Sequence, residues 1–151
     1  MALNILQAHI QAILDLLDAD DVPPALVVLS GENPRDPSTG LPSTPPPYVL
    51  VYVSFRVPGA NEEPDKVSPE DAVSAALYTT AMCHSVGGNQ HAALAVGGRV
   101  RAALHGVTPA VAGRGCGPIK RTDGSFVQRD ETTGVVISDL VDEYEFLSLP
   151  S

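Results

Sequence analysis

Hydrophobic residues near the start of the chain recur with the spacing of an α-helix, from about Leu3 to Leu17. A weaker second stripe contains Ile5, Ala12 and Leu16. A helix that is apolar on two sides fits between two surfaces. One would be its own sheet, and the other is either a neighbouring subunit or a deeper part of the same domain. The main stripe comprises Leu6, Ile10, Ile13, Leu14 and Leu17.

The clearest strand pattern is the alternation from Tyr48 to Val57, after a shorter strand expected at Leu26–Ser30. One face should belong to the core, because every side chain on it is apolar. The opposite face is too apolar for open water until Ser54, so we expect something to cover it. The first face carries Val49, Val51, Val53, Phe55 and Val57, and the second carries Tyr48, Leu50, Tyr52, Ser54 and Arg56.

Two long loops interrupt this pattern. Gly31–Pro47 contains six prolines, which lack a backbone donor, so the segment cannot enter a sheet interior. We expect it to be extended and mobile in the free subunit, and we expect a second polar loop at Pro58–Ser68. Loops of this length in a compact domain are usually functional or disordered.

The middle of the chain predicts a short helical turn, a strand and a second long helix. Ser68 followed by Pro69 and two acidic residues is a typical helix start. A strand from Ala76 to Val86 fits the next residues better, although a single helix through Met82 remains open. Asn89 then caps a helix to about His105. Gly97 and Gly98 each cost that helix about 1 kcal/mol, which suggests a close packing contact.

The last third predicts a hairpin and a closing strand. Asp123-Gly124 favours a tight turn between residues 117–121 and 126–130. Val135–Leu149 is strand-like, but its apolar residues change face, so we expect a bulge or break between Asp139 and Glu143. Together these elements predict one α+β domain spanning residues 1–151, with two main helices packed on one face of a mostly antiparallel sheet.

Charge is unevenly distributed along this acidic chain, whose formal net charge is −9. Residues 1–75 contain 11 acidic and 3 basic side chains. Such a chain repels phosphate groups, which argues against specific nucleic-acid binding. Oppositely charged parts of neighbouring copies could face each other, although two solvated faces remain an equal alternative. Residues 99–129 carry only Asp123 as an acid, against Arg99, Arg101, Arg114, Lys120, Arg121 and Arg129.

The reactive side chains do not form a convincing catalytic or metal site. Cys83 and His84 are adjacent in an expected strand, so their side chains should point to opposite faces. The four histidines lack metal-ligand spacing, and the Gly-rich stretch 113–120 lacks the Gly-Lys-Ser/Thr junction of a phosphate loop, so we interpret it as a flexible loop. We therefore expect no enzyme activity, no cofactor and no metal.

The cellular compartment is inferred from features that the sequence lacks. Two cysteines do not make a disulfide framework, and the first residues lack the basic start of a secretory signal. No stretch approaches the roughly 18 apolar residues of a membrane span. We expect a soluble protein made in a reducing cytoplasm, with no membrane partner.

The order of these elements resembles the tail terminator proteins of long-tailed bacteriophages, over nearly the whole chain. The resemblance rests on ILQAHIQAILDLL, PYVLVYVSF, YTTAMCHSVGGNQHAALAVGGRVRAALHG and VVISDLVDEYEFLSLP, in this order. The long Pro-rich loop and the helix start at Ser68 depart from the pattern. The resemblance implies a virion protein of the tail neck, assembled in the host cytoplasm. It would form a ring, usually a hexamer, that ends tail-tube polymerisation and joins tail to head.

This interpretation gives three groups of candidate residues. Its partners would be identical subunits, the tail tube protein and a head-completion protein, while DNA passes the lumen without specific binding. The subunit or partner interface comprises Ile5, Leu16, Tyr48, Leu50, Tyr52, Arg99, Arg101, Lys120, Arg121 and Arg129. The acids of the lumen would be Asp139, Asp142, Glu143 and Glu145, and the docking loop contains Pro34, Arg35, Asp36, Pro37, Pro45 and Pro46.

Three other interpretations remain open at this point. A different neck protein, such as a head-completion connector, would share the ring and differ in its partner. A small cytosolic enzyme would use Cys83 or Cys116 as a nucleophile. A ligand-binding domain would stay monomeric at every concentration.

Overall fold

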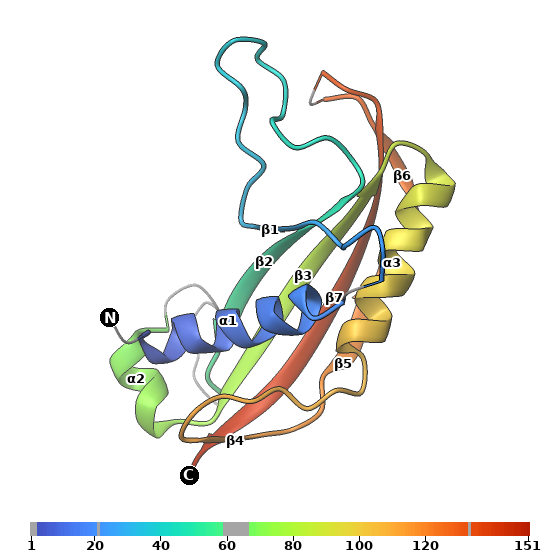
Figure 1. Ribbon diagram of the computed structural model, residues 1–151. Coiled ribbons are helices and arrows are strands. Elements are labelled where there is room, and N and C mark those ends of the chain that lie inside the picture. Colours follow the sequence, from blue (N-terminus) through green and yellow to red (C-terminus); the bar gives the residue numbers. More distant parts are fainter. Residues whose placement is uncertain (1–2, 21, 59–66, 133) are drawn as a thin grey trace.

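The computed structural model describes residues 3–20, 22–58, 67–132 and 134–151. These described residues form three helices and seven strands (Figure 1). Most of the expected loop at 58–68 lies outside the described residues. The elements are α1 Ile5–Asp18, β1 Val28–Ser30, β2 Tyr48–Arg56, α2 Pro69–Ser74, β3 Leu77–Gly87, α3 Gln90–Leu104, β4 Arg114–Cys116, β5 Lys120–Gly124, β6 Gln128–Asp130 and β7 Ile137–Pro150.

All seven strands join one sheet, with the order β1-β2-β3-β7-β4 and with β5 and β6 also paired to β7. The pairs are antiparallel except β1 with β2, which is parallel. The long strand β7 is therefore the backbone partner of four other strands. This arrangement confirms the expected α+β class with a mostly antiparallel sheet.

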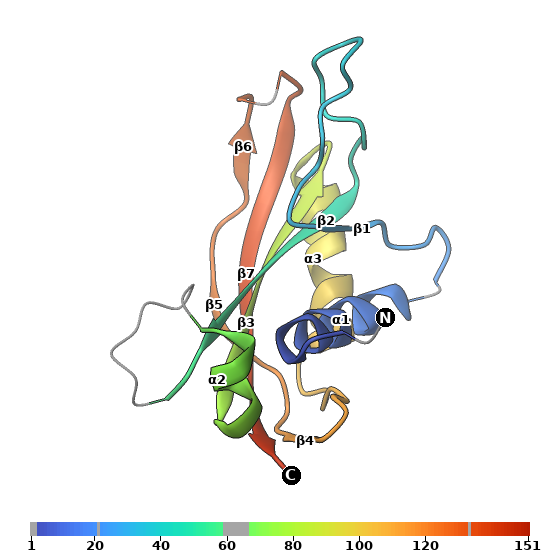
Figure 2. The same ribbon diagram turned by 90° about the vertical axis from the view of Figure 1, so that its left-hand side faces the viewer.

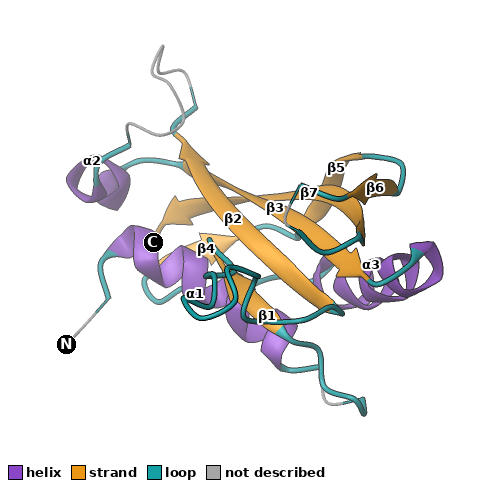
Figure 3. Cartoon of the chain, turned by 90° about the horizontal axis from the view of Figure 1, so that it is seen from above, coloured by secondary structure: helices purple, strands orange, loops and turns teal. Residues whose placement is uncertain are grey.

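Helices α1 and α3 lie on the same side of the β2-β3-β7 layer (Figure 3). Val49, Val51 and Cys83 point toward these helices from β2 and β3, and Tyr144 does so from β7. They pack in one cluster with Ile13 and Leu17 of α1 and with Val96, Val100 and Leu104 of α3. Burial of this apolar surface is the main source of stability of the fold. Because the chain contains no tryptophan, the core consists mostly of aliphatic side chains.

Short-range hydrogen bonds determine where α1, α2 and α3 begin, and the sequence pattern predicts the starts at Ser68 and Asn89. The Asn4 side chain accepts from the Gln7 backbone N–H, and the Gln7 side chain accepts from the Asn4 N–H, which completes a capping box. Ser68 caps α2 by accepting from the Asp71 N–H, and Asn89 caps α3 by accepting from the Ala92 N–H. The alternative of one helix through Met82 is wrong, because α2 ends at Ser74 and β3 begins at Leu77.

The expected bulge between Asp139 and Glu143 is wrong. Strand β7 pairs with β3 residue by residue, from Gly87 opposite Ser138 to Leu77 opposite Ser148. The apolar positions change face because a second, smaller core lies on the other side of the sheet, near the start of β7. It consists of Tyr48, Val86 and Ile137, with Leu29, Leu50 and Val135 against it.

The expected hairpin at Asp123-Gly124 is also wrong. Both residues belong to β5 and lie opposite Glu143 and Asp142 of β7, and β6 pairs with β7 as well. The register shift in this region lies between Arg121 and Asp123. The stretch 113–120, expected to be a flexible loop, contains strand β4, which pairs with the end of β7. Pairing with the long strand β7 therefore outweighs the local preference of Asp123-Gly124 for a tight turn.

The Pro-rich loop leaves the sheet and returns as a two-legged projection (Figures 1 and 2). At its base, the Asn33 side chain donates to the Thr44 carbonyl at 2.9 Å and accepts from the Thr44 N–H at 3.1 Å. Further out, Arg35 and Pro42 form an isolated antiparallel bridge. The loop is therefore outside the sheet interior, as expected, but it is internally hydrogen-bonded rather than simply extended.

Candidate functional site

The cysteine and histidine that are adjacent in sequence do not meet. Cys83 lies in the main core, and burial together with the nearby Asp142 carboxylate raises the pKa of its thiol to about 12. His84 points to the opposite face, where its Nδ1 lies 2.9 Å from an Asp139 oxygen and its ring meets Tyr52 edge-on. The expectation that these two side chains point to opposite faces of the strand is confirmed.

The other potential metal ligands of the described residues do not gather into one site either. Among the described ranges, His, Cys, Asp and Glu side chains form no group of three or more that could hold a metal ion. Cys116 is half-buried, and desolvation raises the pKa of its thiol as well. No helix in the described part of the chain is long and apolar enough to cross a membrane.

Three of the four expected lumen acids share the face of the sheet opposite the helices. Asp139 pairs with His84, and Glu145 accepts from the Thr80 hydroxyl at 3.1 Å and lies 3.7 Å from an Arg56 nitrogen. Glu143 lies between them on the same strand face, opposite Met82. This outer face is therefore acidic along β7, although two of its acids have partners within the subunit.

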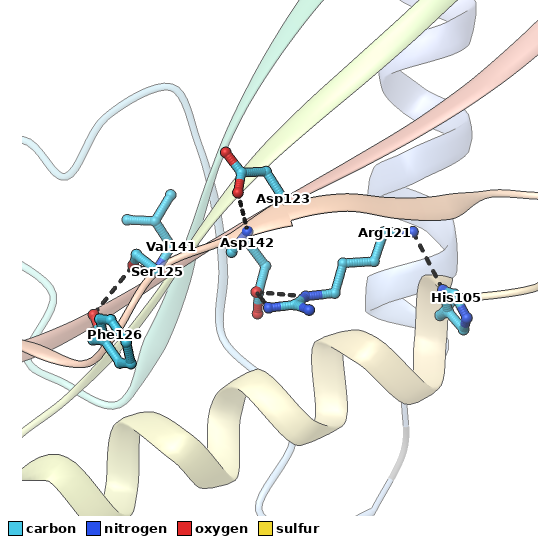
Figure 4. Close-up of polar contacts among 8 residues, drawn as sticks. His105, Arg121, Asp123, Ser125, Phe126, Val141 and Asp142 are labelled. Carbon is cyan, nitrogen blue, oxygen red and sulfur yellow. Dashed lines mark hydrogen bonds and ion pairs between the residues drawn. The ribbon is translucent and has the colours of Figure 1, made fainter.

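Asp142 is the exception among these acids, and its assignment to the lumen is corrected. It points to the helix side, is only 5% exposed and forms an ion pair with Arg121 at 2.8 Å (Figure 4). Hydrogen bonding and charge from this carboxylate raise the pKa of Arg121. A buried, paired carboxylate cannot present charge to passing DNA, since its field is compensated locally.

The structure separates the apolar interface candidates. Tyr48 is 5% exposed and belongs to the smaller core, so its assignment to an exposed interface is corrected. Leu50 is half-buried beside that core, whereas Tyr52 is 44% exposed on the outer face. Ile5 and Leu16 are half-buried on α1. The smaller core thus provides part of the cover that the apolar face of β2 requires.

The basic interface candidates also divide into paired and outward-facing groups. Arg99 donates to Asp20 at 2.7 Å and to the carbonyls of Val22 and Pro24, so it holds the chain that leaves α1. The same contact lowers the pKa of Asp20. Arg129 pairs with Glu131 at the surface. Exposed positions remain at Arg101 and Lys120.

The docking-loop candidates differ in what they contact. Pro34, Arg35 and Pro37 are exposed on the projection, and Asp36 is half-buried because Ser38 and Thr39 hydrogen-bond to it. The hydrogen bonds from Ser38 lower the pKa of the Asp36 carboxyl.

Pro45 and Pro46, by contrast, line a hollow against the smaller core. Leu41, Pro42 and Thr44 complete its loop side, and Tyr48, Val135 and Ile137 its sheet side. The base of the loop therefore contributes to the fold, while its tip is available to a partner.

A buried polar network that the sequence analysis missed joins α1, β4 and β7. His9 stacks on Phe146 with ring centroids 5.9 Å apart, and its Nδ1 lies 2.6 Å from the Ile5 carbonyl oxygen. Its Nε2 lies 2.7 Å from the Ser148 hydroxyl, which accepts from Arg114. A carbonyl can only accept, so Nδ1 carries the proton and Nε2 accepts from Ser148. Burial accordingly lowers the pKa of His9.

Arg114 is the second partner in this network. Its guanidinium donates to the carbonyls of Ala72, Val73 and Ala75 at the end of α2, and to Ser148. It therefore satisfies carbonyls that a short helix leaves unpaired. Sequence reasoning grouped Arg114 with the surface charges, because a long-range contact leaves no local pattern.

Comparison with known proteins gives a fold match without a family assignment. No protein-family model matches the chain, and no curated protein matches it. Among solved structures, a chain described as "Virion of native gene transfer agent (GTA) particle" matches with a TM-score of 0.61 and 18% sequence identity. The match covers 97% of this chain and 99% of that chain. At this identity, the similarity establishes a shared fold over the full length of both chains.

Proposed function

We propose that this protein is a structural component of a phage-like virion, specifically a ring subunit of the tail terminator type. The observation that carries the proposal is the full-length fold match with a chain of a gene transfer agent virion, a particle built from assembled protein subunits. Such a ring, of about six copies as the family resemblance implies, would end tube polymerisation and join tail to head.

The distribution of surfaces supports a head-to-tail ring. A ring of identical copies needs two unlike surfaces on each subunit. Asp15 and Asp18 are exposed at the end of α1, and Lys120 is exposed at the start of β5. Asp20, Arg121 and Arg129 are already paired within the subunit. Complementary charges of this kind orient subunits during association.

The outer sheet face is our candidate for the DNA-facing surface. Asp139, Glu143 and Glu145 give this face a negative strip that would repel phosphate and let DNA pass. Changing all three to Asn or Gln should slow DNA ejection while leaving particle assembly intact. Ejection at the wild-type rate from these particles would exclude the lumen assignment.

The tip of the Pro-rich projection is our candidate contact with the tube or the head connector. Replacing residues 37–40 with a Gly-Gly link would keep Leu41 in the hollow and the Asn33–Thr44 base, and would shorten only the tip. We expect an unfolding free energy within about 0.5 kcal/mol of wild type and fewer joined particles. Joining at the wild-type level would remove the tip from the interface.

The direct test of the proposal is quantitative mass spectrometry of purified particles. We expect the chain to be present at a small fixed copy number near six per particle, and electron microscopy of particles lacking it should show unjoined tails of irregular length. Absence of the chain from purified particles would refute a virion role.

A head-completion connector is the second candidate, because the matched structure is described as a virion without a stated position in it. Tails of normal length that fail to join would favour this connector role. Overlong tube would favour the terminator role.

A further inference from the structure

An apolar groove lies where the end of α1 approaches α3. Its volume is about 680 Å³, ample for a large side chain. Asp20 and Arg99 form an ion pair on its lining, while the remaining residues are apolar. These are Leu16, Ala19, Val22, Pro23, Ala102, Ala103 and Val107. Covering the apolar lining of this groove with another apolar surface would lower the free energy, because both surfaces would leave water.

The groove is bordered by unusual negative charge. Asp15 and Asp18 are exposed on the last turn of α1, which contains no basic residue. The C-terminal end of a helix is the negative end of its dipole, so acids there are unfavourable unless a cation approaches. The occupant of the groove should therefore carry an apolar side chain with positive charge beside it.

The chain itself contains such a segment, at residues 120–129. Phe126 follows β5 and is 90% exposed, more than the other large hydrophobic side chains of the described residues. Lys120, Arg121 and Arg129 flank it, with Asp123 as the one acid within the segment. Arg121 and Arg129 already pair with Asp142 and Glu131 of the same copy, so Lys120 is the basic side chain of this segment that faces solvent without an ion pair to the described residues. The residues from Lys120 to Phe126 are exposed without interruption.

The backbone that carries Phe126 is held in place. Ser125 N–H donates to the Val141 carbonyl at 2.8 Å, and its hydroxyl accepts from the Val141 N–H at 3.0 Å (Figure 4). On the same segment, Arg121 is held by its ion pair with Asp142 of β7. A prepositioned aromatic residue loses little conformational entropy on binding, which favours its use as an interface anchor.

The two surfaces cannot meet within one molecule. Strands β5 and β6 are hydrogen-bonded to β7 at one edge of the sheet, and Figure 2 shows this edge across β7 from α1. Contact between them therefore requires a second copy, and it joins unlike surfaces in a head-to-tail manner.

We infer that Phe126 of one copy inserts into the α1–α3 groove of the next copy, with Lys120 of the same segment facing the exposed acids Asp15 and Asp18 at the end of α1. This inference deepens the proposed ring function and rests on it. The contact is heterologous, so an open assembly keeps one free groove at one end and one free Phe126 at the other until a ring closes.

The test uses two variants that each disable one surface of the purified chain. Phe126→Asp removes the anchor, and Ala102→Trp fills the groove from its exposed side. By sedimentation velocity, wild type should form species larger than a monomer as concentration rises. Each variant should associate at least about tenfold more weakly. Leu94→Asp, at another exposed apolar site, should associate as wild type does.

Mixing the two variants is the sharper measurement. Phe126→Asp still has its groove and Ala102→Trp still has its Phe126, so the mixture should form a one-to-one heterodimer and nothing larger. A photoreactive phenylalanine analogue at position 126 should cross-link to Leu16, Val22 or Ala102 of a second copy. No cross-link between copies, or adducts only elsewhere, would overturn the inference.

These results separate the inference from the proposed function. Particles that contain the chain at ring copy number, with no cross-link at the groove, would leave the virion role standing and refute this contact. Particles without the chain would refute the virion role, while the cross-link would still decide whether the contact exists.

Discussion

Gly87 allows the sharpest prediction about the fold, because a helix begins directly against it. A Cβ at Gly87 would lie 2.3 Å from the backbone nitrogen of Ala93 and 2.6 Å from the carbonyl carbon of Ala92. Favourable carbon contacts need about 3.5–4.0 Å. The neighbouring atoms are backbone of the first turn of α3, where Ala93 N–H donates to the Asn89 carbonyl at 3.1 Å. Neither atom can move without disrupting the helix start.

Gly87→Ala should therefore destabilise the protein by about 3 kcal/mol or more, at the upper end of typical overpacking costs. Gly88→Ala is the matched control, since its Cβ would meet nothing within 4 Å. The control should stabilise the fold by about 0.4–1 kcal/mol, because alanine restricts the unfolded chain.

Urea unfolding followed by circular dichroism measures both variants. With a typical slope, Gly87→Ala should lower the midpoint by about 1–2 M, and Gly88→Ala should raise it slightly. Equal midpoints for the two variants would show that β3 and α3 do not pack as closely as described here.

Three further predictions concern buried polar groups. Asp142→Asn should lower the free energy of unfolding by about 1–3 kcal/mol, because it weakens a charge-assisted contact with Arg121. Glu143→Gln on the outer face should change it little. Equal losses of stability in urea unfolding would contradict the conclusion that these two carboxylates face opposite sides of the sheet. The pKa of His9 is lowered in the folded protein, so the unfolded chain takes up a proton at this residue at a higher pH than the folded chain does. The free energy of unfolding should therefore fall as the pH drops below 6.5. His9→Gln should flatten that part of the pH dependence between about pH 5 and pH 7, and an unchanged profile would argue against a buried neutral His9. Cys83 should resist alkylation in the folded protein at a pH where Cys116 reacts, as peptide mapping would show; equal labelling would mean that the main core opens readily.

The sequence by itself determined the elements whose ends are fixed by neighbours along the chain. Asn4, Ser68 and Asn89 each cap a helix through a bond to a residue three positions away. The alternation of Tyr48–Val57 likewise predicts a strand, because side-chain direction follows from backbone geometry alone. These features need no knowledge of distant residues.

Tertiary structure alone decided which strands pair and which face each residue occupies. Strand β7 recruits β5 and β6, so the local turn signal at Asp123-Gly124 loses to pairing with residues about 20 positions away. Ile137 and Asp142 take unexpected faces because the sheet has a core on each side. The network of His9, Arg114 and Ser148 depends on contacts up to 139 residues apart. The physical reason is that capping and strand alternation act over a few residues, whereas pairing and burial are decided by whichever distant surfaces meet when the chain collapses.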